Sequence, residues 1–132
     1  MNRKKSREIA MKALYQMDIN KSSSDQALVN IKEIIENEEL NNIDFDYINN
    51  IVKGVTEKKA ELDCKIEENL KSWKINRISK VNLCILRLSI YEIIYINDIP
   101  SKVSINEAVE LSKTYAEEKS HRFINGILAN FL

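Results

Sequence analysis

The scarcity of helix-breaking and turn-forming residues constrains this chain more than any other feature. Its 132 residues include only two glycines, Gly54 and Gly126, and one proline, Pro100. Closely spaced strands need frequent turn residues, so this composition favours long helices joined by polar turns. A chain of this length can also bury a core without help from a disulfide or a metal. We therefore expect one all-α domain over residues 1–132.

Apolar residues recur at helical spacing along most of the chain. The pattern predicts helices over about residues 3–19, 27–35 and 48–70, the last breaking near Trp73. Residues 79–95 are apolar on nearly every side, which is typical of a central helix surrounded by others. A strand over residues 90–96 is the alternative. No second β-prone run is present to pair with it, so we prefer the helix.

The last third of the chain carries the clearest helix boundaries. Pro100 cannot continue a helix and disfavours helical backbone at the residue before it, so a helix must end just before Pro100. Ser104 and Glu107 match a capping box, with Val103 in the position of the hydrophobic staple, and predict that the next helix starts at Ser104. Ser120 is expected to cap a last helix whose apolar residues extend to Phe131.

Residue patterns typical of catalysis or metal binding are missing from the sequence. Two isolated glycines cannot form a phosphate-binding loop, and His121 lacks companions at the spacing of a metal or nucleophile site. Cys64 and Cys84 form no C-x-x-C pair and are interpreted as core residues in a reducing compartment. No segment has the features of a signal peptide or a membrane span. We expect a cytoplasmic protein with no enzymatic activity, cofactor or metal.

Charge is unevenly distributed, although the formal net charge is zero. Residues 1–13 carry five basic residues against one acid, whereas residues 25–46 carry seven acids against one base. Four of the basic residues, which we call the basic cluster, are Arg3, Lys4, Lys5 and Arg7. At the start of a helix they oppose its dipole, each at a cost of about 0.3 to 1 kcal/mol. A frayed, solubilising terminus is one explanation, and a phosphate-binding arm is the one we favour.

A second basic stretch runs from Lys71 to Arg87 without an acid and includes Trp73. Single-strand binders stack nucleobases on aromatic rings between cations, so Trp73 is a candidate for this role. A tryptophan that stands between Leu70 and Ile75 is more often a core residue, and we favour that interpretation.

Three motifs, in order along the chain, resemble the NusB family of RNA-binding antitermination factors. Residues 7–15 read R-x-x-A-x-x-x-L-Y, and residues 86–92 read L-R-x-x-x-Y-E. Residues 99–128 read IPSKVSINEAVELSKTYAEEKSHRFINGIL. This stretch resembles the family's V-x-I-N-E-A-V/I-E-L run, followed by S-x-x-F-V/I-N-G-V/I-L. Together the motifs cover essentially the whole chain.

The resemblance implies an all-α fold with about six or seven helices in two packed helical subdomains. It also implies a function in transcription antitermination. Proteins of this family pair with the ribosomal small-subunit protein NusE, and the pair binds single-stranded boxA RNA of ribosomal RNA leaders within a transcribing RNA polymerase complex. The domain over residues 1–132 would then be an RNA-binding domain. A helical protein–protein interaction module without RNA binding is the alternative.

The resemblance also implies which residues bind. The basic cluster would contact RNA phosphates. Further RNA contacts would come from the start of the last helix, from Ser120, His121, Arg122 and Phe123. Helix N-termini bind anions, and the rings of His121 and Phe123 are available for stacking on a base. A plain core position is the alternative for Phe123.

Protein contacts are implied for Tyr15, together with Ile19 one helical turn further on. A core position is the alternative for Tyr15. The chain departs from the family in two respects. Its basic cluster is richer in lysine, which lacks the bidentate geometry of arginine. In addition, Lys80 and Asn82 stand where many relatives place acids.

Overall fold

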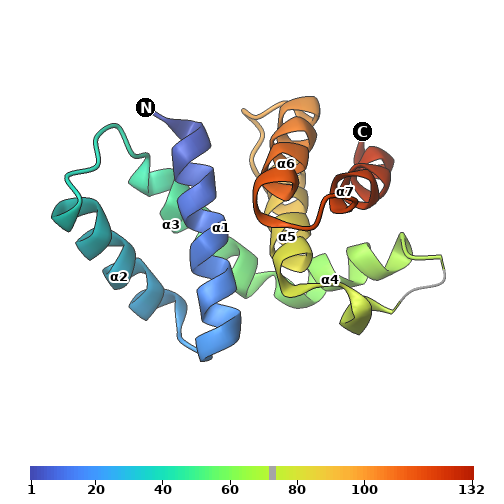
Figure 1. Ribbon diagram of the computed structural model, residues 1–132, viewed down its shortest axis with the longest axis horizontal. Coiled ribbons are helices and arrows are strands. Elements are labelled where there is room, and N and C mark those ends of the chain that lie inside the picture. Colours follow the sequence, from blue (N-terminus) through green and yellow to red (C-terminus); the bar gives the residue numbers. More distant parts are fainter. Residues whose placement is uncertain (72–73) are drawn as a thin grey trace. The chain divides into compact units, whose positions relative to one another are not determined.

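The computed structural model describes residues 1–71 and 74–132. Within these ranges the chain forms seven α-helices, two short 3-10 helices and no strand (Figure 1). Two compact units divide the chain, residues 1–57 and residues 58–132. None of the described helices is both long and apolar enough to cross a lipid bilayer. The all-α class predicted from the scarcity of glycine and proline is confirmed.

The first unit consists of three helices that pack against one another. They are α1 (Arg3–Asn20), α2 (Ser24–Asn37) and α3 (Phe45–Glu57). Side-chain oxygens cap the first two: Asn2 accepts a hydrogen bond from the backbone N–H of Lys5, and Ser23 accepts one from that of Gln26. Each helix buries one apolar stripe, as the periodicity predicts, because the opposite stripe faces water.

The second unit is built around one buried helix. Its elements are α4 (Lys59–Glu68), the 3-10 turn Ile75–Arg77, α5 (Lys80–Tyr95), α6 (Ser101–Tyr115), α7 (Ser120–Leu128) and the 3-10 turn Ala129–Phe131. Helix α5 contacts α4, α6 and α7, and every residue from Cys84 to Glu92 is buried. The central helix predicted over residues 79–95 is therefore confirmed, and the alternative strand over residues 90–96 is wrong.

The single helix predicted over residues 48–70 is wrong, because the chain leaves the helical conformation at Lys58. This residue has φ −97° and ψ 13° and separates α3 from α4. The apolar pattern carries no sign of the break. Val55 and Leu62 are seven residues apart, about two helical turns, so the stripes stay in register across it. The break coincides with the boundary between the units, since α3 packs in the first unit and α4 in the second.

The capping box predicted at Ser104 is also wrong. Helix α6 begins three residues earlier, at Ser101, with Pro100 at its N-cap. Ser104 is buried, and its Oγ donates a 2.8 Å hydrogen bond to Oε1 of Glu92, which is fully buried in α5. A serine followed by a glutamate three residues later fits the pattern wherever its hydroxyl points, so only the packing of α6 on α5 reveals the true partner.

We expect Ser104→Ala to lower the free energy of unfolding by about 1 to 3 kcal/mol, because a buried carboxyl group then loses a hydrogen bond. Urea denaturation followed by circular dichroism measures the change. Ser101→Ala, three residues earlier in α6, is the matched control and is expected to cost no more than about 0.5 kcal/mol. Equal losses in the two variants would show that the Ser104–Glu92 hydrogen bond contributes nothing to stability.

Candidate nucleic-acid interface

The four residues of the basic cluster lie on the first turns of α1, but their environments differ. Lys4 is exposed, and Lys5 and Arg3 are half-buried. Arg7 is only 3% exposed, and its guanidinium carbon lies 5.6 Å from the centroid of the Tyr47 ring in α3. Arg7 therefore belongs to the packing between α1 and α3, and the other three residues form the surface of the cluster.

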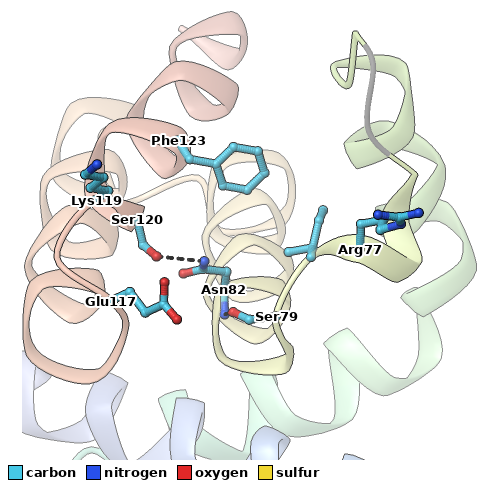
Figure 2. Close-up of a pocket in the computed structure, with 8 residues that line it drawn as sticks. Arg77, Ser79, Asn82, Glu117, Lys119, Ser120 and Phe123 are labelled. Atoms are coloured by element: carbon cyan, nitrogen blue, oxygen red, sulfur yellow. Dashed lines mark hydrogen bonds between the residues drawn. The ribbon is translucent and has the colours of Figure 1, made fainter.

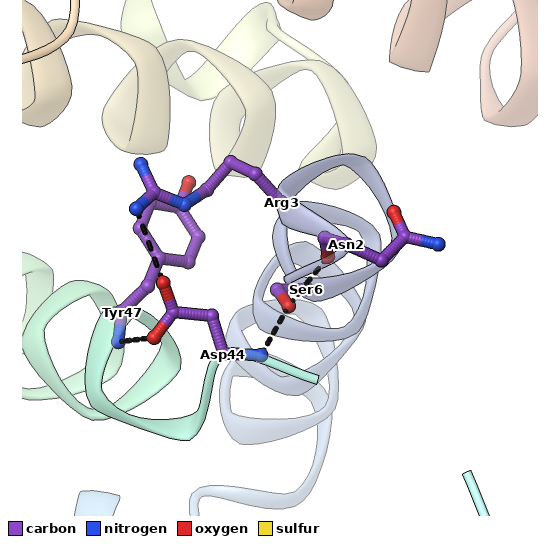
Figure 3. A network of polar contacts seen from close by, with 5 residues as sticks. All are labelled: Asn2, Arg3, Ser6, Asp44 and Tyr47. Carbon is purple, nitrogen blue, oxygen red and sulfur yellow. Dashed lines mark hydrogen bonds and ion pairs between the residues drawn. The ribbon is translucent and has the colours of Figure 1, made fainter. Parts of the chain in front are cut away.

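Arg3 is held by residues at the start of α3 (Figure 3). Its Nη2 lies 3.1 Å from Oδ2 of Asp44, and its guanidinium carbon lies 4.5 Å from the centroid of the Tyr47 ring. The other carboxylate oxygen of Asp44, Oδ1, accepts a 3.0 Å hydrogen bond from the backbone N–H of Tyr47. Asp44 therefore caps α3 and pairs with Arg3 at the same time.

Ser6 fastens the start of α1 to the loop before α3. Its hydroxyl donates a 2.8 Å hydrogen bond to the carbonyl of Asn2 and accepts one of 2.8 Å from the backbone N–H of Asp44 (Figure 3). The backbone N–H of Asn2 donates to the carbonyl of Asn42 in the same loop. The frayed terminus considered as an alternative is therefore not supported, because the cluster stands on a capped and tethered helix end.

Tyr15 and Ile19 lie further along α1, four residues apart and so on one face of the helix. Tyr15 is half-buried, and Ile19 is exposed although it is apolar. Tyr15 is not among the buried core residues of the unit. Both side chains therefore contribute to the surface of α1, as contact with a partner requires.

The second group of candidate residues forms the first turn of α7. The prediction that Ser120 caps this helix is wrong: Lys119 occupies the N-cap and makes no side-chain cap. The Oγ of Ser120 instead accepts a 3.0 Å hydrogen bond from Nδ2 of Asn82 in α5 (Figure 2). This bond ties the start of α7 to the start of α5.

A pocket of about 370 Å³ opens where α5 and α7 begin (Figure 2). It is lined by Arg77, Ile78, Ser79, Asn82, Glu117, Lys119, Ser120 and Phe123. Of the four residues predicted in the first turn of α7, Ser120 and Phe123 line the pocket. Arg122 is exposed and His121 half-buried, and neither belongs to the lining. Phe123 is half-buried with its ring beside the pocket, so the plain core position is not observed.

Asn82 belongs to the lining of this pocket, and its amide oxygen is buried. It is 8% exposed, its Nδ2 binds Ser120, and its Oδ1 has no partner among the described residues. Ser79 accepts a 3.2 Å hydrogen bond from the backbone N–H of Asn82 and caps α5, whose positive dipole end therefore lies at the pocket. The lining combines the ring of Phe123 with two cations, Arg77 and Lys119, and one acid, Glu117. Sequence reasoning marked Asn82 only as a departure from the family, and the pocket itself was not predicted.

One cation of the second basic stretch is not at the surface. Arg87 is buried and makes a bidentate pair with Asp63 of α4, with Nε–Oδ1 and Nη2–Oδ2 distances of 2.7 and 2.9 Å. Lys74 and Lys80 are exposed. Trp73, proposed as either a core or a stacking residue, lies outside the described residues. The stretch therefore adds Arg77 to the pocket, whereas Arg87 is part of the packing between α4 and α5.

Residues 4–132 match the model of the NusB family. The chain belongs to the NusB family. Among curated proteins, the transcription antitermination protein NusB of Clostridium novyi is 52% identical over 132 residues, which cover the whole chain and 98% of that protein. The protein of the same name from Clostridium acetobutylicum is 53% identical, with 96% of it covered. The resemblance found in the motifs is therefore confirmed.

Solved structures give the same result for the fold. T. maritima NusB superposes with a TM-score of 0.87 at 31% identity, covering 99% of this chain and 90% of that one. A crystal structure of the antitermination factors NusB and NusE in complex with double-stranded RNA matches with a TM-score of 0.83 at 28% identity, covering 99% and 97%. In this NusB-family chain the candidate contacts are divided between the units, with the basic cluster in the first and the α7 turn in the second.

Proposed function

We propose that this NusB-family chain is a transcription antitermination factor that binds single-stranded boxA-type RNA together with the ribosomal protein NusE, within a transcribing RNA polymerase complex. The observation that carries the proposal is the full-length likeness to proteins named transcription antitermination protein NusB, at 52% and 53% identity. A structural neighbour that contains NusB, NusE and double-stranded RNA supports NusE and RNA as partners. The factor acts in the cytoplasm as an adaptor, without enzymatic activity, cofactor or metal.

The two groups of candidate residues would divide the work of binding RNA. Exposed cations supply affinity through phosphates, whereas contacts with bases supply sequence preference. We assign phosphate contacts to the basic cluster, excluding the buried Arg7, and to Arg122. We assign base contacts to Phe123, His121 and Ser120.

Contact with NusE is assigned to Tyr15 and Ile19, whose exposed apolar surface suits a protein better than a nucleic acid. Tyrosine is one of the residue types that contribute most to the binding energy of protein interfaces. This assignment places the protein contact on α1, the helix that also carries the basic cluster.

The proposal is tested by fluorescence anisotropy with a boxA RNA, a scrambled strand and a duplex, each with and without NusE, at two salt concentrations. We expect boxA to bind more tightly than either control and NusE to tighten it further. With three to five phosphate contacts, log affinity should fall against log salt with a slope of about −2 to −4. Equal affinity for all three RNAs would refute sequence recognition, and binding of NusE without any RNA would leave the helical interaction module.

A further inference from the structure

The ion pair between Arg3 and Asp44 lies within the surface proposed to bind RNA. The Arg3 side chain is 38% exposed, and that of Asp44 is 15% exposed. A phosphate that approaches the Arg3 guanidinium must also approach a carboxylate whose Oδ2 lies 3.1 Å from Nη2. Because the potential of each charge falls with distance, a carboxylate this close to the guanidinium reduces the attraction between Arg3 and a phosphate. The Arg3–Asp44 pair has no net charge, so Arg3 attracts a phosphate less than an arginine without a carboxylate beside it would.

We propose that Asp44 competes with RNA phosphates for Arg3, so that this ion pair lowers the affinity of the chain for RNA. The inference rests on the proposed function, since it assumes that RNA binds at the basic cluster. Asp44, which is not one of the candidate RNA contacts, would then be an acidic residue that limits RNA binding.

Asp44 acts as a competitor rather than as a positioning residue because other contacts already place Arg3. The guanidinium carbon lies 4.5 Å from the centroid of the Tyr47 ring, a contact that does not depend on the carboxylate. The start of α1 is fixed by the hydrogen bonds of Ser6 and by the Asn2 cap. Loss of the carboxylate therefore releases the charge of Arg3 while stacking on the ring keeps its guanidinium in place.

Lys5 differs from Arg3 because the carboxylate beside it also lies beside a second lysine. Its Nζ lies 3.6 Å from Oε1 of Glu8, and the Nζ of Lys12 lies 3.6 Å from the same oxygen. One carboxylate divided between two flexible lysines neutralises neither, and exposed pairs of this kind are weak. Arg3 faces Asp44 alone at a shorter distance, so the competition is concentrated there.

The inference is tested with Asp44→Asn in the full chain. Asparagine caps helices about as well as aspartate, so the hydrogen bond to the Tyr47 N–H is retained while the charge is removed. We expect boxA RNA to bind about five-fold more tightly at 0.1 M salt, with a log–log salt slope steeper by about 0.7, the contribution of one additional phosphate contact on a single strand. Asp44→Ser, which also caps helices, is the second variant, and circular dichroism shows that both fold.

Asp46→Asn is the matched control, because it removes one exposed acid from the same first turn of α3. It is expected to change affinity by about two-fold or less, since an exposed charge is screened by salt. Arg3→Gln supplies the second control. Asp44→Asn should tighten binding in the natural chain and have no effect in the Arg3→Gln background, because the released charge belongs to Arg3.

The outcomes separate this inference from the proposed function. Tighter binding by Asp44→Asn that disappears in the Arg3→Gln background supports the competition. Unchanged or weaker binding, or a gain that persists without Arg3, overturns the competition while RNA binding by the natural chain still supports the proposed function. If the natural chain and all variants bind no RNA, both fail.

Discussion

Lys4→Ala combined with Lys5→Ala is expected to weaken RNA binding by about 25-fold at 0.1 M salt. Each phosphate contact on a single strand contributes about 0.7 to the slope of log affinity against log salt, so two contacts contribute about 1.4. Lys4 and Lys5 carry this effect because Arg7 is buried and Arg3 is paired with Asp44. Anisotropy titrations over a series of salt concentrations measure both the loss of affinity and the shallower slope.

Damage to the fold cannot account for such a loss. Both lysines lie in the first turn of α1, which contains no acid, so their charges oppose the helix dipole. Their removal should leave the free energy of unfolding unchanged or raise it by about 0.3 to 1 kcal/mol per residue. Lys32→Ala combined with Lys53→Ala is the control, since it removes the same charge from exposed positions of α2 and α3 in the same unit. Equal weakening by both double variants would refute a specific role for the cluster.

Helix formation was predictable because the information is local. Apolar periodicity places the helices of both units, and the nearly continuous apolar run in α5 marks it as the central helix of the second unit. Pro100 separates α5 from α6 as expected, since its ring excludes it from a helix interior. Each of these features depends on residues within about four positions of one another, so a single sequence contains enough to recognise them.

Features that depend on distant partners were not predictable. Ser104 fits a capping box, yet its hydroxyl binds Glu92, twelve residues earlier in the chain. The break at Lys58 falls at the boundary between the two units and leaves the apolar pattern undisturbed. In both cases the local pattern is satisfied by two structures, and tertiary contacts select between them.

The candidate site also combines features that are local in the sequence with features that depend on distant residues. The charge pattern identifies the basic cluster, but it cannot tell that Arg7 is buried against Tyr47 or that Arg3 is paired with Asp44. Those partners lie about forty residues away in the sequence. Likewise, the pocket at the start of α7 exists only because Asn82 of α5 is brought next to Ser120. A charge count along the chain therefore overestimates how many cations of the cluster are exposed and outside a close ion pair.

Two adjacent residues of α7 should separate RNA binding from folding. Ile124 is fully buried, whereas Phe123 is half-buried and lines the pocket. Ile124→Ala is expected to lower the free energy of unfolding by about 2 to 5 kcal/mol, because it leaves a cavity in a core where α7 packs on α5 and α6. Phe123→Ala should cost less stability but remove base stacking worth about 1 to 3 kcal/mol, which corresponds to about 5- to 150-fold in RNA affinity.

Urea denaturation gives the free energy of unfolding of both variants. RNA anisotropy, measured well below the unfolding transition, gives their RNA affinities. Phe123→Leu is the control, because leucine keeps apolar bulk in the pocket but has no aromatic face. If Phe123 stacks on a base, Phe123→Leu loses RNA affinity nearly as Phe123→Ala does, while the folded fraction of Ile124→Ala binds RNA like the natural chain. If Phe123→Leu binds like the natural chain, the ring only fills space, and base recognition must come from another part of the surface.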